Sequence, residues 1–470
     1  MKFFEEISAI PRASYKEERI ADYLCEFAKA RGLECYRDKT NNVLINAPAT
    51  EGCEDRPALL LQGHTDMVCE KNEGVEHDFD TDGLELYEED GWIKARGTTL
   101  GADNGVAVAV MLYVLDGGVE RHGALQCLFT ASEEVGLDGV KAFDYSRIYA
   151  RRMINMDSAD ESLIIAGCAG GQRSSLKFDV TAETVAAPCV ARISIKGLAG
   201  GHSGEDIDKG RANANKLMGR VLDSLMNDAS VDLRIVSVHG GTKDNAIPRE
   251  CEATVTASDL EALRAKAGEL EAVLRQGISK SDSGLSVSVT PVSSAGEVCC
   301  ISEADAKRLV FFMHCVDNGV FDMNHNIDGL VEWSRNLGIV SCEPTGAEMV
   351  LSSRSSFESR IDESEAELDS FARILGAKAT HYNRYPGWNF APESEMRDAY
   401  LRAFEAVTGK RCEVTVIHAG LECGFISEAV PDMDILSCGP VVLDLHSPDE
   451  RLDKASFERF FTVIKKVIED

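Results

Sequence analysis

Residues 125–136 read LQCLFTASEEVG, an apolar run that ends in two adjacent glutamates, Glu133 and Glu134. A short apolar run bounded by polar residues and glycine is typical of a buried strand. Neighbouring carboxylates repel each other, so a strand end that carries both predicts a cation or a proton at that point. The chemistry of this segment therefore depends on what other segments bring to the same place.

Similar apolar runs lie on both sides of this segment, at 41–47 (NNVLINA), 57–66 (PALLLQGHTD) and 151–160 (RRMINMDSAD). The run 105–115 is long enough to predict a buried helix. Ser14 and Glu17 form an S-x-x-E pattern, which predicts a capping box at the start of a helix that stops at Gly32. Strands that alternate with helices predict a layered α/β domain with its polar site at the strand ends.

The pattern changes in the middle of the chain. Strands are expected at 189–198, 231–241, 248–257 and 285–292, and helices at 209–225 and 258–276. This β-α-β-β-α-β order is typical of a ferredoxin-like unit. Two more helices and two more strands within 303–375 are expected to extend its sheet, and 382–395 to return the chain. We therefore expect one catalytic α/β domain, 1–185 and 386–470, interrupted by an inserted α+β domain, 186–385.

Composition narrows the possible partners. The chain has 49 basic and 79 acidic residues and a formal charge of -30, which opposes binding to nucleic acid or to anionic membranes. The N-terminal stretch has acids where a signal peptide needs an apolar core, and no run approaches ~20 apolar residues. Fifteen cysteines without a C-x-x-C pair fit a reducing compartment. These features predict a cytoplasmic protein that acts on a small molecule or a short peptide.

Metal-ligand residues end several of the predicted strands and loops. They are His64 and Asp66 in GHTD, Asp103 in GADNG, Glu133 and Glu134 in ASEEVG, Asp157 in NMDSAD and His446 in LHSPDE. Two imidazoles and three carboxylates suit zinc, with cobalt or manganese as substitutes. Three carboxylates, two divalent cations and one hydroxide between the cations sum to zero charge, so a pair of ions is expected.

The side chains of this set are predicted to have different roles. Residues two apart in an extended chain face the same side, so Asp66 can accept a hydrogen bond from the His64 nitrogen that does not face a metal. Glu134 is predicted to be a ligand and Glu133 to be the general base that takes a proton from water. The competing interpretation is that one glutamate is solvated and only caps a helix.

These residues stand in motifs that together resemble a known family over nearly the whole chain. The motifs are ISAIPRASYKEERIADYL, LLQGHTDMV, GTTLGADNGVAVA, TASEEVGLDG, MDSAD, AGGHSGEDIDKGRANA, DNAIPRE, HAGLECG and HSPDE. The family is that of the cocatalytic zinc peptidases, which includes aminoacylases, glutamate carboxypeptidases and dipeptidases. The resemblance is closest to its aminoacyl-histidine dipeptidase branch.

The resemblance implies a role for each metal-site residue. Asp103 would bridge two zinc ions and be followed by a cis peptide bond to Asn104. The ligands of one ion would be completed by His64 and Asp157, and those of the other by Glu134 and His446. Glu133 would be the general base and Asp66 the acid that orients His64.

The resemblance also implies that the inserted segment is a lid domain that mediates homodimer formation. His202, in a glycine-rich turn, would stabilise the oxyanion of the reaction, within or across chains. Asn245 and Arg354 would bind the substrate's C-terminal carboxylate, since a guanidinium offers two parallel donors. Glu422 would meet the free α-amino group of a dipeptide.

The sequence as a whole predicts a two-metal dipeptidase that cleaves short peptides with a free amino terminus, including those that end in histidine. One alternative is an amidohydrolase of the same fold that acts on N-acyl amino acids. A second is a metal-dependent binding protein without catalysis, against which the presence of Glu133 argues.

Overall fold

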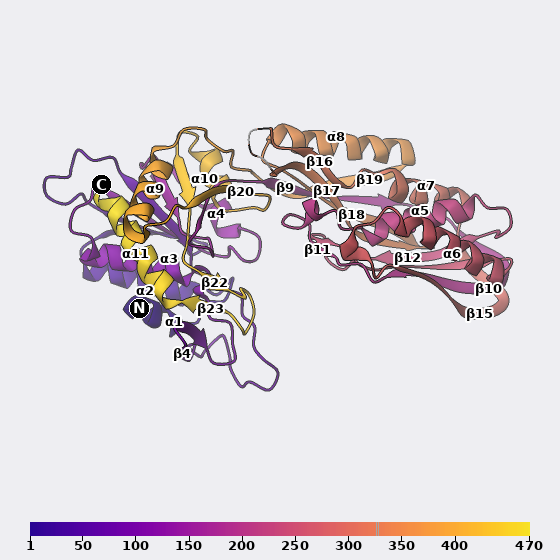
Figure 1. The fold of residues 1–470 in the computed structure, drawn as a ribbon, viewed down its shortest axis with the longest axis horizontal. Coiled ribbons are helices and arrows are strands. Elements are labelled where there is room, and N and C mark those ends of the chain that lie inside the picture. The colour runs from indigo at the N-terminus through magenta and orange to yellow at the C-terminus, as the bar shows by residue number, and fades with distance from the viewer. Residues whose placement is uncertain (326, 328) are drawn as a thin grey trace. The chain divides into compact units, whose positions relative to one another are not determined.

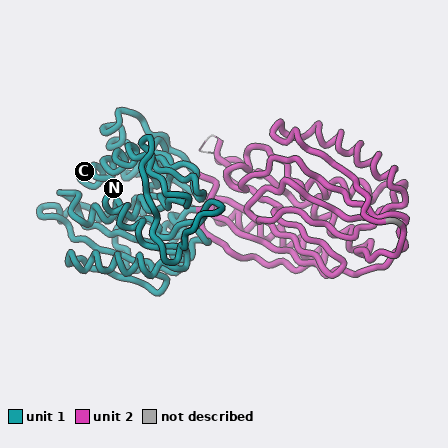
Figure 2. Tube along the Cα trace, turned by 90° about the horizontal axis from the view of Figure 1, so that it is seen from below, with its two compact units in different colours: residues 1–168, 388–416, 421–470 teal, residues 169–387, 417–420 magenta. Residues whose placement is uncertain are grey.

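The chain divides into two compact units, each built from more than one segment (Figures 1 and 2). The computed structural model describes residues 1–325, 327 and 329–470. Unit 1 comprises 1–168, 388–416 and 421–470, and unit 2 comprises 169–387 and 417–420. The expected boundary after residue 185 differs from this division, because strand β9 (Gly170–Phe178) already pairs within the sheet of unit 2.

Unit 1 is organised around an eight-stranded mixed sheet. Its order is β1 (Glu34–Arg37), β2 (Val43–Ala47), β6 (Leu125–Thr130), β3 (Leu59–His64), β7 (Arg152–Asn155), β21 (Asp434–Ser437), β8 (Leu163–Cys168) and β20 (Glu413–Ile417). The central strands β6, β3, β7 and β21 run parallel. Every residue of β3 and β6 is buried, as expected for strands covered on both faces.

Helices and a smaller sheet complete unit 1. The helices are α1 (Lys2–Ser8), α2 (Glu18–Ala30), α3 (Ala102–Tyr113), α4 (Asp138–Ala142), α9 (Glu395–Thr408), α10 (Cys423–Ala429) and α11 (Lys454–Glu469). A four-stranded sheet has the order β22 (Val442–Leu443), β23 (Arg451–Asp453), β5 (Trp92–Ala95) and β4 (Leu86–Glu89). The predicted buried helix is α3, whose apolar residues join one core with α1, α2, α9 and α11.

Unit 2 contains the predicted β-α-β-β-α-β series. It consists of β10 (Ala182–Lys196), α5 (Ala214–Met226), β12 (Arg234–Gly240), β14 (Cys251–Ala257), α6 (Leu260–Arg275) and β15 (Ser286–Ile301). These strands pair antiparallel in the order β15-β10-β14-β12, which is the split-βαβ arrangement.

The same sheet continues beyond the series, as predicted. It adds β17 (Val331–Glu343), β18 (Gly346–Ser355), β9 and β19 (Ala377–Tyr385), and β16 (Gly319–Met323) pairs with β17. Helices α7 (Glu303–Cys315) and α8 (Glu358–Leu375) join α5 and α6 in one core with this sheet. Strand β14 alternates core residues with more polar ones, so the helices cover one face of the sheet. A separate pair, β11 (Gly201–His202) and β13 (Ala246–Ile247), completes unit 2.

Across the described residues, no helix has both the length and the apolar character needed to cross a lipid bilayer.

Candidate metal centre

The ends of three parallel strands create the site in unit 1. Strand β3 ends at His64, which pairs in register with Thr130 at the end of β6, and β7 ends at Asn155. Parallel strands present their carboxyl ends at one edge of a sheet, where polar loops gather. The loops that follow β6 and β7 bring the glutamate pair and Asp157 to the same edge as His64.

Asp103 stands at the centre of this cluster. It lies in the first turn of α3, and its peptide bond to Asn104 is cis, as the family resemblance implied. Its Oδ1 lies 3.0 Å from Nε2 of His64, and its Oδ2 lies 3.2 Å from Nε2 of His446. One carboxylate therefore faces two imidazoles from opposite ends of the sequence.

Two groups of possible ligands share this carboxylate. They are His64, Asp103 and Asp157, and Asp103, Glu134 and His446. Within each group the ligand atoms lie within 4.8 Å of one another, and Glu134 Oε2 is 3.1 Å from His446 Nε2. All five predicted ligands are thus brought together, in an arrangement that can hold two ions with Asp103 between them.

The donor set fits divalent cations. Glu134 Oε1 is buried and has no hydrogen-bond partner among the described residues, so it is free to bind a cation. The hydrogen bonds of His446 with Asp103 and Glu134 raise the pKa of its imidazole to about 10. Burial lowers the pKa of His64, but Asp103 and Asp157 outweigh it and hold that pKa well above its usual value. These carboxylates thus favour positive charge at the position where a metal would supply it.

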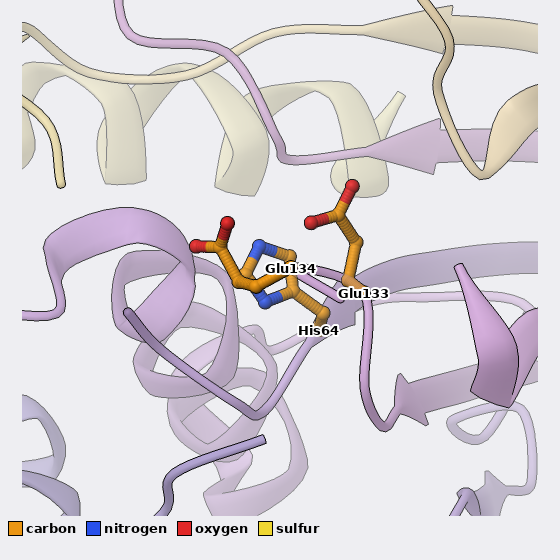
Figure 3. Close-up of side chains that lie close together, drawn as sticks. All are labelled: His64, Glu133 and Glu134. Carbon is orange, nitrogen blue, oxygen red and sulfur yellow. The ribbon is translucent and has the colours of Figure 1, made fainter. Parts of the chain in front are cut away.

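Glu133 lies close to His64 and Glu134. In Figure 3 its carboxylate and that of Glu134 lie on either side of the His64 imidazole, and one ligand atom of each lies within 4.8 Å of those of the other two. Burial raises the pKa of Glu133 well above its usual value; His64 opposes the rise, and Asp157 and Glu134 add to it. A carboxyl group in this setting can accept a proton and hold it.

Asp66 braces both the histidine and the glutamates. Its carboxylate Oδ1 lies 3.4 Å from Nδ1 of His64, and its backbone carbonyl lies 3.1 Å from the same nitrogen. The carboxylate also accepts the backbone N–H groups of Glu133, at 3.0 Å, and Glu134, at 3.2 Å. One buried side chain therefore orients His64 Nε2 toward Asp103 and fixes the start of the glutamate loop.

The predicted capping box at Ser14 and Glu17 is wrong. The Ser14 hydroxyl donates to Asp66 Oδ2 at 2.7 Å, and Glu17 Oε1 accepts from the backbone N–H and hydroxyl of Ser132 at 2.8 and 2.7 Å. The local pattern looked like a helix start, but the partners lie 52 and 115 residues away in sequence. Both side chains support the loops of the site.

Arg12 and Glu450 also support the site, and sequence reasoning missed both. The Arg12 guanidinium donates to the carbonyls of Thr65, at 3.0 Å, and Gly101, at 2.5 Å. Glu450 accepts backbone N–H groups of the segment that leads to Asp103. One signal in the sequence was available for these two residues: each lies in one of the motifs that carry the family resemblance.

Glu422 lies in a buried polar network of unit 1. Its Oε2 accepts from Gln62 Nε2 at 2.5 Å and from Thr130 Oγ1 at 2.7 Å, and Gln62 accepts from Asn155 at 2.6 Å. Burial raises the pKa of Glu422 to about 7. The side chain is 0% exposed, and its other oxygen, Oε1, has no hydrogen-bond partner among the described residues.

The remaining predicted residues cluster within unit 2. His202 pairs with Ala246, and the Ser203 N–H donates to the carbonyl of Asn245 at 2.8 Å, so the His202 and Asn245 segments lie side by side. Burial, followed by the charge of Arg354, lowers the pKa of His202.

Arg354 and the His202 ring are held in defined orientations. Arg354 donates to the Tyr385 hydroxyl at 2.7 Å, and its Nε is buried without a partner among the described residues. His202 Nδ1 accepts the N–H groups of Gly204, at 3.3 Å, and Glu205, at 3.2 Å. A neutral ring held in this way carries its proton on Nε2, which is then a donor.

Comparison with known proteins identifies the family of this chain. A family model described as Peptidase family M20/M25/M40 matches residues 60–470. The chain belongs to that family. The M20 assignment confirms the resemblance that the sequence motifs indicated.

Two relatives match this M20 chain over nearly its full length. It is 35% identical over 470 residues to the cytosol non-specific dipeptidase of Escherichia coli strain K12, covering 99% of this chain and 96% of the relative. It is 35% identical to the aminoacylhistidine dipeptidase of Vibrio alginolyticus, whose crystal structure it matches with a TM-score of 0.91 over 100% of this chain and 95% of the other.

The aminopeptidase PepT of Bacillus cereus ATCC 10987 matches at 16% identity, with a TM-score of 0.56 over 99% of this chain and 96% of the other, which concerns the fold alone. The predicted fold class, a mixed α/β domain with an inserted α+β domain, is therefore confirmed.

Proposed function

We propose that the chain is a two-metal dipeptidase that hydrolyses dipeptides with a free amino terminus. One observation carries the proposal: Asp103 offers one oxygen to His64 and the other to His446, so that two ligand groups share one carboxylate. The similarity to two dipeptidases over nearly the full chain supports the substrate class.

The proposed ligands are His64 and Asp157 for one ion, Glu134 and His446 for the other, and Asp103 for both. Nitrogen and oxygen donors of this kind suit zinc, with cobalt or manganese as substitutes. When bound, a pair of such ions polarises the scissile carbonyl and lowers the pKa of the attacking water.

Glu133 is proposed as the group that moves the proton. Its carboxylate takes the proton of the attacking water and passes it to the nitrogen of the leaving amine, so that no free amide anion forms. The Asp66 carboxylate fixes the backbone of Glu133 and orients the His64 ring, so both side chains are already oriented when a substrate binds.

Unit 2 is proposed to supply the substrate contacts. His202, with its proton on Nε2, would donate to the oxyanion, and Arg354 with Asn245 would hold the C-terminal carboxylate. The buried Nε of Arg354, which has no partner among the residues that the structure describes, supports this role, since a carboxylate would satisfy it. Glu422, whose buried Oε1 has no partner among the described residues, is proposed to meet the free α-amino group of the dipeptide.

Three further features remain predictions of the sequence: a cytoplasmic location, zinc as the resident metal, and a homodimer formed through unit 2. Light scattering of the purified protein would test the dimer, and metal analysis of protein purified without added metal would test zinc. A monomer at micromolar concentration would contradict the first, and another resident metal would contradict the second.

The activity is tested on metal-stripped protein reconstituted with zinc, cobalt or manganese. Each form is assayed with a panel of dipeptides, Xaa-His among them, and with the same dipeptides acetylated at the amino group. We expect the free dipeptides to be cleaved faster. Faster cleavage of the acetylated forms would favour an N-acyl amino acid amidohydrolase. Full metal loading without turnover of either set would favour a binding protein.

A further inference from the structure

The ligand His446 lies in the most exposed position of the proposed metal centre. Its side chain is 49% exposed, whereas that of His64 is 0% exposed. It stands in the loop between β22 and β23, and its backbone has a φ of 60°, in the left-handed region. A histidine on an exposed hairpin loop has conformational freedom that metal binding must remove. Something must therefore hold this loop near Asp103.

Glu450, four residues after His446, makes that connection. It is the buried end of the loop, at 2% exposed, and its two oxygens accept four consecutive backbone N–H groups. Oε2 accepts from Leu100 at 2.8 Å and Gly101 at 2.9 Å. Oε1 accepts from Ala102 at 2.8 Å and, more weakly, from Asp103 at 3.4 Å. The His446 loop is thereby fastened to the segment that carries the shared carboxylate.

Arg12 fixes the same segment from its carbonyl side. Its guanidinium donates to the Gly101 carbonyl, while Glu450 accepts the Gly101 N–H. Arg12 also donates to the carbonyls of Thr65 and Asp66, which follow His64. The segment before Asp103 is therefore fixed relative to the β3 end by Arg12 and relative to the His446 loop by Glu450.

We infer that Glu450 is a positioning residue of the metal centre. Its carboxylate sets the spacing between the His446 loop and Asp103, and so holds the group of Asp103, Glu134 and His446 in shape for its ion. The group of His64, Asp103 and Asp157 is oriented mainly from the β3 side, by Asp66 and Arg12. Loss of the Glu450 carboxylate therefore weakens one ion site more than the other. The inference rests on the ligand set in the proposed function.

The test compares Glu450→Gln with Asp449→Asn in metal-stripped protein titrated with cobalt, followed by the visible absorption of the bound ion. The substituted glutamine has the same shape as the glutamate, but its NH₂ group faces backbone donors, so some of the four N–H groups lose their acceptor. Asp449 is the adjacent, exposed residue of the same loop, and its variant removes the same charge. His446→Ala is included as the reference for loss of one site.

We expect Asp449→Asn to bind two equivalents of cobalt, as the unaltered protein does, and His446→Ala to bind one. Glu450→Gln should bind the first equivalent normally and the second 10- to 100-fold more weakly, the usual effect of losing an outer contact of a metal site. Wild-type affinity for both equivalents in Glu450→Gln would overturn the inference. Two tight equivalents in His446→Ala would instead overturn the ligand set.

A second variant covers the case in which Glu450→Gln does not fold. Glu450→Asp keeps the charge but shortens the side chain by one methylene, so it reaches fewer of the four N–H groups. We expect its second equivalent to bind with an affinity between those of Glu450→Gln and the unaltered protein, with a far-UV circular dichroism spectrum unchanged. An unchanged second equivalent in this folded variant would also overturn the inference.

Discussion

The two adjacent glutamates differ in what surrounds them, and this difference is testable residue by residue. Asp66 accepts the backbone N–H groups of both, but Glu134 also faces His446 and has a buried oxygen without a partner among the described residues, whereas burial raises the pKa of Glu133 well above its usual value. We expect Glu133→Gln to lower kcat by about 10²- to 10⁴-fold, the usual contribution of a general base, with both metal ions retained. Glu134→Gln should instead lose metal.

Steady-state kinetics and metal analysis of the two variants provide the check. Normal turnover by Glu133→Gln at full metal loading would contradict the proton-transfer role. Loss of metal from Glu133→Gln, with metal kept by Glu134→Gln, would show that the two roles are exchanged.

Asp66 provides a second prediction at this scale. Its carboxylate faces His64 and accepts hydrogen bonds from Ser14, Glu133 and Glu134. An asparagine in its place would turn an NH₂ group toward some of these donors, which would then lose their acceptor. We expect Asp66→Asn to weaken metal affinity by about 10- to 100-fold. Ser14→Ala, which removes one of these contacts, should have the smaller effect. Competition with a zinc-selective chelator measures both, and an equal loss in the two variants would argue against Asp66 as the centre of this network.

The sequence could predict which candidate ligands come together in the structure, but it missed much of what supports them. Ligands were identifiable because histidines and acids follow apolar strands at motif spacings. The supports were not, because their partners are backbone groups far away in sequence. Glu450 binds N–H groups roughly 350 residues away, and nothing in the local pattern HSPDE distinguishes a buried carboxylate from a solvated one.

At the scale of elements, local sequence patterns predicted helices and strands correctly where tertiary packing buries the apolar face that the pattern specifies. The β-α-β-β-α-β series of unit 2 is confirmed, because alternating and helical apolar spacing each specify a buried face. The capping box failed because an S-x-x-E pattern states only what two side chains can do locally. Tertiary partners at Asp66 and Ser132 bind them instead.

A half-buried lysine joins two helices of unit 2 and predicts a pH dependence. Lys216 of α5 donates to the carbonyls of His314 and Val316 at the end of α7. Burial lowers its pKa from 10.5 to about 8. Between these values the unfolded chain holds a proton that the folded chain has lost, so this group's contribution to stability rises with pH from about 8 to 10.5 and is constant below.

Chemical denaturation of the unaltered protein and of Lys216→Met, from pH 7 to pH 10, tests this. We expect the free energy of unfolding of the unaltered protein, minus that of the variant, to be constant up to about pH 8 and to increase above it. A difference that stays flat, or that falls above pH 8, would contradict the assignment.

At the scale of the whole molecule, each unit has its own hydrophobic core, and all the proposed metal ligands belong to unit 1. Calorimetry should therefore resolve two unfolding transitions, of which metal stabilises one. At a free ion concentration 1,000 times Kd, binding adds about 4 kcal/mol to the free energy of unfolding. Removal of metal by a chelator should lower that transition and leave the other unchanged.

Two variants identify the transitions. His446→Ala should reduce the metal-dependent shift, whereas Leu222→Ala, in the buried core of α5, should lower the other transition. A single transition that shifts as a whole with metal would mean that the units unfold together, contrary to this prediction.

The sequence predicted that one domain interrupts another, but not where the interruption begins. The apolar run that becomes β8 (Leu163–Cys168) is followed at once by β9, with only Ala169 between them. No change of composition marks this point, since both strands are largely buried. The partner strands decide the boundary: β8 pairs with β21 in unit 1, and β9 pairs with β18 in unit 2.

The late position of His446 has a consequence for how the protein is made. The ribosome has added four of the five proposed ligands by residue 157. It then synthesises all of residues 169–387 before it adds the fifth ligand, His446. At 5–20 residues per second the wait lasts roughly 15 to 60 seconds. Through that interval the nascent polypeptide lacks one of the proposed ligands, so under the proposed function peptide cleavage begins only after translation has passed the hairpin that carries His446 and Glu450.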